Sequence, residues 1–225
     1  MASRVALAAA VAALAAAAWA ALDPARGAVA VLLAAVATLV AAAAWIERTP
    51  GSAKDLTLVA TLAGIAAAGR VLFAPVPSVQ PVTVIVAASG VALGPKRGFA
   101  VGALAAFASN MILPQGPHTP WQMLAWGACG AIAGLGRTVF RRRVPFVVLC
   151  FGLGFLYGTI TDLWHWYAFW TPHTQANLLF VLARGLPFNT AHAIGNVVIA
   201  WFAGPELRRV LERYARRLRT EVVWA

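Results

Sequence analysis

The stretch PFVVLCFGLGFLYGTITDLWH, residues 145–165, decides the fold of this chain. As far as Leu156 it carries no charged residue, which is typical of a helix that crosses the hydrocarbon layer of a membrane. Its strongly polar residues, Asp162 and His165, stand at one end. Polar groups are costly in hydrocarbon, so they usually face a partner or a water-filled cavity. The stretch therefore predicts a membrane helix with a polar site at one end.

Similar apolar stretches along the chain predict about eight spans in total. They cover 4–22, 28–46, 57–73, 77–93, 98–113, 121–136, 145–165 and 187–204. Of all residues, 61% are hydrophobic and 11% are charged, which excludes an ordinary soluble domain. Residues 5–22 resemble a cleaved signal peptide, but such a signal precedes a soluble chain, and here a second span follows, so we expect a retained helix. The predicted fold class is an all-α, polytopic integral membrane helical bundle.

Composition divides the chain into four parts. Residues 1–46 form an N-terminal pair of transmembrane helices built mostly of Ala, Val and Leu, and 47–55 form a linker with Pro and Gly. Residues 56–204 form a six-helix core that is richer in Gly, Asn, Gln, His and Trp. Residues 205–225 form a basic tail, which is expected to lie as an amphipathic helix on the cytoplasmic leaflet.

The distribution of positive charge predicts the orientation. The net charge is +11, with 18 Lys and Arg against 7 Asp and Glu. With eight spans, fifteen of the 18 basic residues fall on the side that holds both termini, whereas Arg26 and Arg184 fall on the other and Arg70 lies within a span. Basic residues collect on the cytoplasmic side of membrane proteins. We therefore expect a multi-pass protein of the cell membrane with cytoplasmic N- and C-termini, and no nucleic-acid partner.

Polar side chains gather in the outer halves of the spans, which predicts a pocket that opens outward. The last span begins FNTAHAIGN (188–196), where Asn189, His192 and Asn196 form one stripe. Asp162, His165 and Trp166 share a helix face. The proline-rich loop at 113–120 leads into a further polar cluster. The candidate ligand-binding residues are Asn110, Gln115, Trp121, Gln122, Asp162, Trp166, Asn189, His192 and Asn196.

Plainer interpretations of single residues stay open. Asp162 could form a salt bridge with Arg70 or lie exposed at the membrane interface. Cys129 and Cys150 have no pairing or metal-binding pattern and are expected to be packed core residues. No phosphate-binding motif occurs, so no means of ATP hydrolysis is visible. No cofactor and no metal is predicted.

Ala60, Gly64 and Ala68 are spaced by four residues, so they share one face of the third span. Small residues at this spacing allow another helix to approach closely. The face is a candidate partner-binding surface, although packing within the bundle or an alanine-rich composition also explains it.

These landmarks resemble the substrate-binding S component of energy-coupling factor (ECF) vitamin transporters. The resemblance covers residues 55–204. It is carried by the small-residue face at 60–68, the turn GPKRG (94–98) with FAVGA (99–103), and Ser109-Asn110. The stretch QGPHTPWQM (115–123), with 162–164 and the stripe at 189–196, is most similar to the cobalamin-type subgroup. His118, Met111 and Ile112 stand where that subgroup tends to have aromatic residues, so the ligand could differ.

The resemblance implies a mechanism. A vitamin, with cobalamin or a related corrinoid as the leading ligand, binds on the outer face. A transmembrane coupling protein then docks on the face of Ala60, Gly64 and Ala68, and two cytosolic ATPase subunits drive the release of the ligand inside. The protein itself would not be an enzyme. The family pattern gives the N-terminal helical pair no role.

Two other hypotheses compete with a vitamin-binding S component. Asp162 with His165 or His192 could serve as acid and base in an intramembrane enzyme, although no catalytic motif is present. A structural subunit without a ligand would tolerate apolar residues at Asn189, His192 and Asn196. An S component for a different vitamin also remains an alternative.

Overall fold

The computed structural model of the protein describes residues 2–48 and 52–219. Across these two ranges all regular structure is helical, as predicted from the sequence. The middle of the predicted linker (49–51) and the end of the tail (220–225) lie outside the described residues. The elements are α1 (Ala2–Ala20), η1 (Pro24–Arg26), α2 (Gly27–Arg48), α3 (Ser52–Leu72), α4 (Val82–Leu93), α5 (Pro95–Ser109), α6 (Thr119–Leu135), α7 (Arg137–Phe140), α8 (Arg143–Phe169), α9 (Gln175–Phe202) and α10 (Gly204–Arg219).

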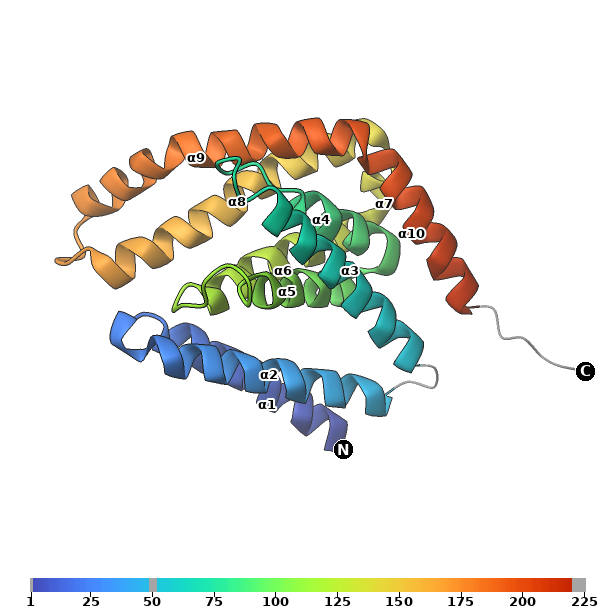
Figure 1. Ribbon diagram of the computed structural model, residues 1–225, viewed down its shortest axis with the longest axis horizontal. Helices are drawn as coiled ribbons and strands as arrows, with labels where there is room; N and C mark the ends of the chain where they lie inside the picture. The colour runs from blue at the N-terminus through green and yellow to red at the C-terminus, as the bar shows by residue number, and fades with distance from the viewer. Residues whose placement is uncertain (1, 49–51, 220–225) are drawn as a thin grey trace, which may run out of the picture.

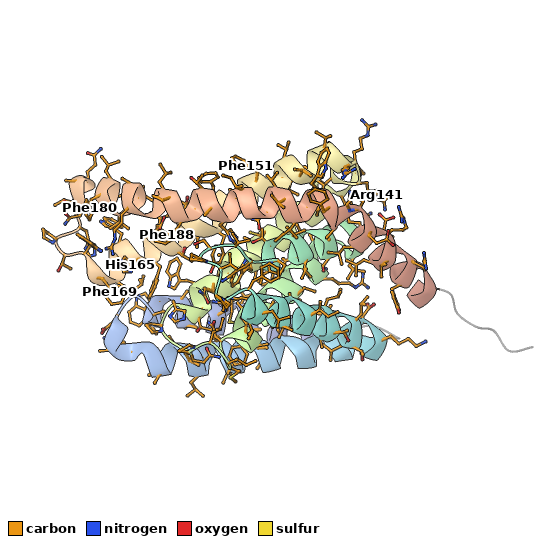
Figure 2. All side chains as sticks on the ribbon, turned by 45° about the horizontal axis from the view of Figure 1, so that its top comes forward. Arg141, Phe151, His165, Phe169, Phe180 and Phe188 are labelled. Atoms are coloured by element: carbon orange, nitrogen blue, oxygen red, sulfur yellow. The ribbon has the colours of Figure 1, made fainter. Side chains whose placement is uncertain are left out.

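Two long helical hairpins enclose a central group of helices (Figure 1). The antiparallel pair α8 and α9 lies along one side, the pair α1 and α2 lies along the other, and α3 to α6 lie between them. The start of α1, the end of α2, the start of α3 and the end of α10 lie at one end, which we call the arginine-rich end. The α1–α2 turn, the loop at 110–118 and the α8–α9 turn lie at the opposite, distal end. Figure 2 shows Arg141 at the first end and His165, Phe169 and Phe180 at the second.

Two described helices, Lys54–Leu72 and Arg143–Phe169, are long and apolar enough to cross a bilayer. Shorter apolar helices run over Ala8–Ala20, Gly27–Thr38 and Val82–Leu93. The helices at α3 and α8 are therefore long enough to be two of the predicted spans. The total of about eight spans stays a prediction.

The helix boundaries differ most from expectation at α9. A span was predicted over 187–204, but α9 begins at Gln175 and contains Pro187. The Thr174 side chain caps its start by accepting a hydrogen bond from the backbone N–H of Asn177, 3.2 Å away. The predicted membrane span therefore covers only the second part of a longer helix. Within membrane helices proline is tolerated because neighbouring groups satisfy the freed carbonyl.

The helix predicted over 77–93 is also shorter than expected, because α4 begins at Val82. Ser78 has a left-handed backbone with φ of 58°, and Pro81 directly precedes the helix. Residues 73–81 therefore form a connection of turns that leads from α3 under α9 (Figure 1).

Glycines bring α4, α5 and α6 into backbone contact. A Cβ atom added to Gly130 would lie 2.1 Å from the carbonyl oxygen of Gly98, and one added to Gly98 would lie 2.6 Å from the Cα of Gly90. No side chain fits between these backbones. Close approach at small residues is the usual way in which membrane helices gain contact area, since lipid supplies no hydrophobic drive for association.

At the arginine-rich end, charged side chains tie the helix ends together. Arg97 on α5 forms an ion pair with Asp55 on α3. Arg208 on α10 donates to the carbonyl oxygen of Phe140 at 2.6 Å and lies over the ring of Phe146. Leu211 is buried against the core. The tail helix therefore packs one face on the bundle, and its contact with a lipid leaflet stays a prediction.

Cys129 and Cys150 are free thiols buried in the core, as the sequence indicated. The Cys129 thiol lies 3.8 Å from the carbonyl oxygen of Leu153. Both residues serve as small packing groups between helices.

Candidate ligand-binding site

The structure distributes the nine predicted ligand-binding residues over several environments rather than around one hollow. One group joins α3, α5 and α6 near the distal loop. A second joins α4 and α9 in the middle of the bundle. A third lies between the distal halves of α8 and α9, beside an open cavity.

The first group centres on Asn110, which is buried at the end of α5. Its Oδ1 accepts a hydrogen bond from Arg70, and the same guanidinium donates to Ser109 at 2.6 Å. Its Nδ2 donates to Thr119 and Gln122, each at 2.9 Å. Asn110 thus has partners for both its acceptor and its donors, and it joins three helices.

Gln115 closes the distal loop onto this group. Its Nε2 donates to the carbonyl oxygen of Phe107 at 3.1 Å, and its Oε1 accepts from Thr119 at 2.8 Å. This network fixes the loop at the start of α6, while the buried Nε of Arg70 has no hydrogen-bond partner among the described residues.

Arg70 is compensated without a carboxylate. Besides Ser109 and Asn110, its guanidinium lies over the Trp126 ring, 5.0 Å from the ring centre. Asp162 has a different partner, described below. The salt bridge between Arg70 and Asp162, which the sequence left open, is therefore not formed. Arg70 donates to Ser109 and Asn110, whereas Asp162 accepts from Asn189.

The second group forms a chain of hydrogen bonds through buried His192. Its Nδ1 lies 2.8 Å from the carbonyl oxygen of Ser78, which can only accept, so Nδ1 carries the proton. In the neutral ring Nε2 then accepts from the hydroxyl of Thr83 at 2.9 Å. The Thr83 oxygen in turn accepts from the indole N–H of Trp126 at 3.1 Å. His192 thus joins α9 to α4, and the geometry fixes its tautomer.

Asn196 lies one turn beyond His192 and is fully buried between α8 and α9. Its Nδ2 donates to the carbonyl oxygen of Cys150 at 3.2 Å. Its Oδ1 has no hydrogen-bond partner among the described residues. Two residues of the stripe, His192 and Asn196, are therefore buried between helices. The third, Asn189, lies nearer the distal end of the bundle, beside Asp162.

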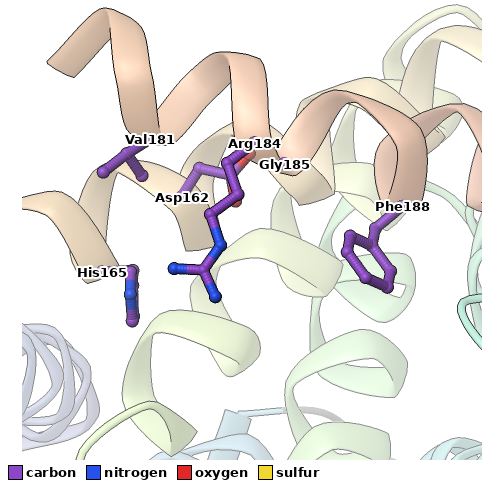
Figure 3. A pocket seen from close by; sticks show the side chains of 6 residues that line it. All are labelled: Asp162, His165, Val181, Arg184, Gly185 and Phe188. Atoms are coloured by element: carbon purple, nitrogen blue, oxygen red, sulfur yellow. The ribbon is translucent and has the colours of Figure 1, made fainter. Parts of the chain in front are cut away.

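The third group contains the cavity. Asp162 and His165 on α8 and Val181, Arg184, Gly185 and Phe188 on α9 line an open space of about 140 Å³ (Figure 3). Asp162 is held by Asn189, whose Nδ2 donates to Oδ2 at 2.7 Å. Of the nine candidates, Asp162 alone is part of this lining. Gly158 and Gly185 leave room for the side chains of Asn189 and Asp162.

A Cβ atom at Gly158 would lie 1.9 Å from Oδ1 of Asn189, and one at Gly185 would lie 2.2 Å from Oδ2 of Asp162. The carboxylate therefore rests against the backbone of α9. A glycine at each position is a condition for this arrangement, since any larger residue would displace the side chains.

Trp121 and Trp166 lie apart from the cavity lining. Trp121 packs against Ala20, Ala21 and Ala30 of the N-terminal hairpin. Trp166 has ring contacts with Tyr167 and His173 at the α8–α9 turn, and its buried indole N–H has no partner among the described residues. A ligand contact by Trp121 would require the hairpin to shift.

Sequence reasoning did not select Arg184 and Phe188, and it counted His165 in the outer polar cluster and as a possible catalytic group but not among the ligand-binding residues. One signal pointed to Arg184, which is one of two basic residues expected on the outer side. Thr83 and Trp126 were also missed. Each stands in an apolar stretch, and nothing in the sequence there indicates which hydrogen bonds the hydroxyl and the indole form. No cluster of three His, Cys, Asp or Glu that could hold a metal ion occurs in the described part of the chain.

Comparison with known proteins identifies the family. A search of curated proteins and a search of solved structures each find no match. The family model described as ECF transporter, substrate-specific component, matches residues 54–202, which include α3 to α9 apart from the first residues of α3. Since this match covers well over half of the 225 residues, the chain belongs to the family of substrate-specific components of ECF transporters.

Proposed function

We propose that the protein captures a vitamin at its distal end for ATP-driven import, and that cobalamin or a related corrinoid is the leading ligand. Members of its family are membrane subunits that bind a small-molecule substrate and work with an ECF module. The observation that carries the proposal is the open cavity between α8 and α9, at the end opposite the arginine-rich one. In a membrane with the positive end in the cytoplasm, this cavity opens outward.

The network around Asn110 supports a ligand site at the same end. It fixes the loop at 110–118 through Arg70, Gln115 and Thr119, at the same end of the bundle as the α8–α9 cavity. Prepared sites bind more tightly because less conformational freedom is lost on binding. Asn110, Gln122, Asp162, Asn189 and His192 are proposed to act there, directly or by holding a neighbour in place.

A partner surface is available on α3. Ala60, Gly64 and Ala68 are all exposed in this chain, and a Cβ atom at Gly64 would meet no atom within 4 Å. An exposed face of small residues supports docking of a transmembrane coupling protein, which in turn associates with two cytosolic ATPase subunits.

The acid–base hypothesis finds less support in the geometry. Asp162 has Asn189 as its hydrogen-bond partner, and no hydrogen bond joins it to His165 or His192 among the described residues. His192 is engaged on both ring nitrogens. We therefore propose binding and transport rather than catalysis.

The test uses the full chain purified from its native membrane in mild detergent. Binding of a labelled vitamin panel, including cyanocobalamin, is measured by equilibrium dialysis, and copurified subunits are identified by mass spectrometry. The proposal expects one vitamin to bind and coupling-protein and ATPase subunits to copurify. A folded protein that binds no vitamin and brings down no such subunit would contradict it.

A further inference from the structure

Arg184 differs from most arginines of this chain in its place. Its side chain is exposed and lines the cavity at the distal end, whereas most basic residues lie near the arginine-rich end. It forms no hydrogen bond, ion pair or ring contact within the described ranges, as is also true of the side chains of Arg137, Arg142 and Arg213 at the arginine-rich end. A guanidinium with five donors therefore lines the cavity without an acceptor.

The groups around Arg184 make the cavity suited to an anion. Figure 3 shows the guanidinium suspended between the imidazole of His165 and the ring of Phe188. Asp162 does not neutralise it, because no ion pair of 4 Å or less joins the two residues and the carboxylate is turned toward Asn189. The Oδ1 atom of Asp162 has no hydrogen-bond partner in the described part of the chain, so it can accept from a donor on a ligand.

We propose that this cavity binds the oxyanion of the transported ligand, a carboxylate or a phosphate, on Arg184, with a neighbouring amide or hydroxyl of the same ligand donating to Asp162. This inference deepens the proposed function by naming the chemical class of its substrate. Arginine is suited to the role because its planar fork meets two oxygens of such a group at once. His165 adds a second donor on the opposite wall.

The form of the cavity is suited to one polar group of a larger ligand. Its volume is about 140 Å³ and it is open to its surroundings. Val181 is buried, whereas the ring of Phe188 is exposed and can contact the rest of the ligand. The substrate class that we propose is therefore an organic acid or a phosphate ester.

The experiment compares ligands that differ only in this group. Cobinamide phosphate is paired with cobinamide, nicotinate with nicotinamide, and biotin with its amide. Dissociation constants are measured on the purified full chain. We expect the wild type to prefer the acidic member of a bound pair by at least tenfold, and Arg184→Gln to abolish this preference without weakening the neutral member.

Two further variants sharpen the result. Arg184→Lys keeps the charge but loses the fork and should retain part of the preference. Arg26→Gln is the matched control, since Arg26 is the other basic residue of the distal end and is paired with Asp23. It should change no dissociation constant by more than twofold. The inference is overturned if Arg184→Gln binds the acidic member as tightly as the wild type does.

A separate arm works without any vitamin. Thermal unfolding is followed in inorganic phosphate and in chloride at equal ionic strength. Phosphate should raise the melting temperature of the wild type but not that of Arg184→Gln, and equal shifts in both would overturn the inference. If no vitamin binds while this phosphate effect holds, the oxyanion site stands and the proposed function fails.

Lipid phosphate is the other source of the same chemistry. The measurements are therefore repeated in nanodiscs of neutral phosphatidylcholine and in nanodiscs that also contain anionic phosphatidylglycerol. A ligand preference that is equal in both lipids supports substrate binding by Arg184. If Arg184→Gln changes only the response to anionic lipid and leaves ligand affinity unaltered, the residue serves a lipid headgroup and the inference falls.

Discussion

Trp121 on α6 donates its indole N–H to the carbonyl oxygen of Ala18 in the last turn of α1, 3.2 Å away. Trp164 on α8 donates in the same way to Ala21, at 2.8 Å. The last carbonyls of a helix have no partner within it, so the two tryptophans satisfy acceptors that would otherwise be left free. The N-terminal hairpin is thereby fixed to two core helices at the distal end.

The first prediction tests this docking directly. A Cβ atom at Gly27 would lie 3.6 Å from the Cβ of Pro117, which is within the range of a disulfide bond. The double variant Gly27→Cys with Pro117→Cys should therefore form an intramolecular disulfide on mild oxidation, detected by peptide mass spectrometry. Gly27→Cys with Gly152→Cys is the control, because position 152 has no atom within 4 Å. Equal yields from the two pairs would contradict the docked position of the hairpin.

The second prediction concerns the glycine contact between α5 and α6. Gly130→Ala places a methyl group against the backbone of Gly98, which cannot rotate away, so overpacking should cost about 1–3 kcal/mol of stability. Gly152→Ala adds the same methyl group in open space on α8 and should be neutral or slightly stabilising. Thermal unfolding in detergent compares the two, and a Gly130→Ala protein as stable as Gly152→Ala would refute the close approach.

The third prediction concerns the support of Asp162. Gly158→Ala would place its methyl group 1.9 Å from Oδ1 of Asn189, so the amide must turn away from Asp162. We expect ligand affinity to fall about tenfold, which corresponds to about 1.4 kcal/mol. The loss of stability should be smaller than in Gly130→Ala. The added methyl group displaces only the side chain of Asn189, whereas in Gly130→Ala it meets the backbone of Gly98. Unchanged affinity would mean that the pair has no part in binding.

The sequence predicted the helical fold because apolar runs of sufficient length leave few alternatives in a bilayer. That Asn110, Asp162 and His192 belong to one outward-facing site stays a prediction. The sequence did not predict how those residues pair. Asn110 and His192 are engaged with Arg70 and Thr83, and such pairings depend on the rotation of helices about their axes, which no single-helix pattern records.

Cavity-lining residues were harder still to find. Arg184 precedes the span that was predicted over 187–204, and Phe188 stands at its start, whereas α9 begins at Gln175. Placing α9 from Gln175 brings both residues opposite Asp162 and His165. The Thr174 cap was the available signal for the longer helix, and a cap is weak evidence when a proline follows within the same segment.

The fourth prediction concerns pH. Burial lowers the pKa of His118 from its ordinary value of 6.5, and the positive charge of Arg70 lowers it further, while a hydrogen bond to the Pro114 backbone opposes these effects. The unfolded chain therefore takes up the proton first as the pH falls. Stability from the neutral ring is present above pH 6.5 and is lost as the pH falls below it.

His118→Phe isolates this effect, because a phenyl ring keeps the edge contact with Trp164 but cannot be protonated. Melting temperatures are measured between about pH 5 and pH 8. The wild type should lose more stability than the variant over the acidic part of this range, and the difference between the two curves should vanish at the alkaline end. Parallel curves would show that His118 does not titrate differently on folding.

The fifth prediction separates partner docking from ligand binding. Gly64 lies on the exposed face of α3, where an added Cβ atom meets no atom of this chain within 4 Å. Gly64→Leu should therefore leave the melting temperature and the dissociation constant of the vitamin unchanged. If a helix of the coupling protein packs on this face, the leucine holds it away, since close approach depends on the small residue. Copurification of the coupling protein should then fall at least tenfold.

Gly152→Leu is the matched control, because Gly152 is exposed with open space around it but lies on α8. It should leave copurification intact. Loss of the partner in both variants would point to a general effect of bulk on the membrane-exposed surface, and retention in both would place the docking face elsewhere. Only a loss confined to Gly64→Leu fits a surface made by Ala60, Gly64 and Ala68.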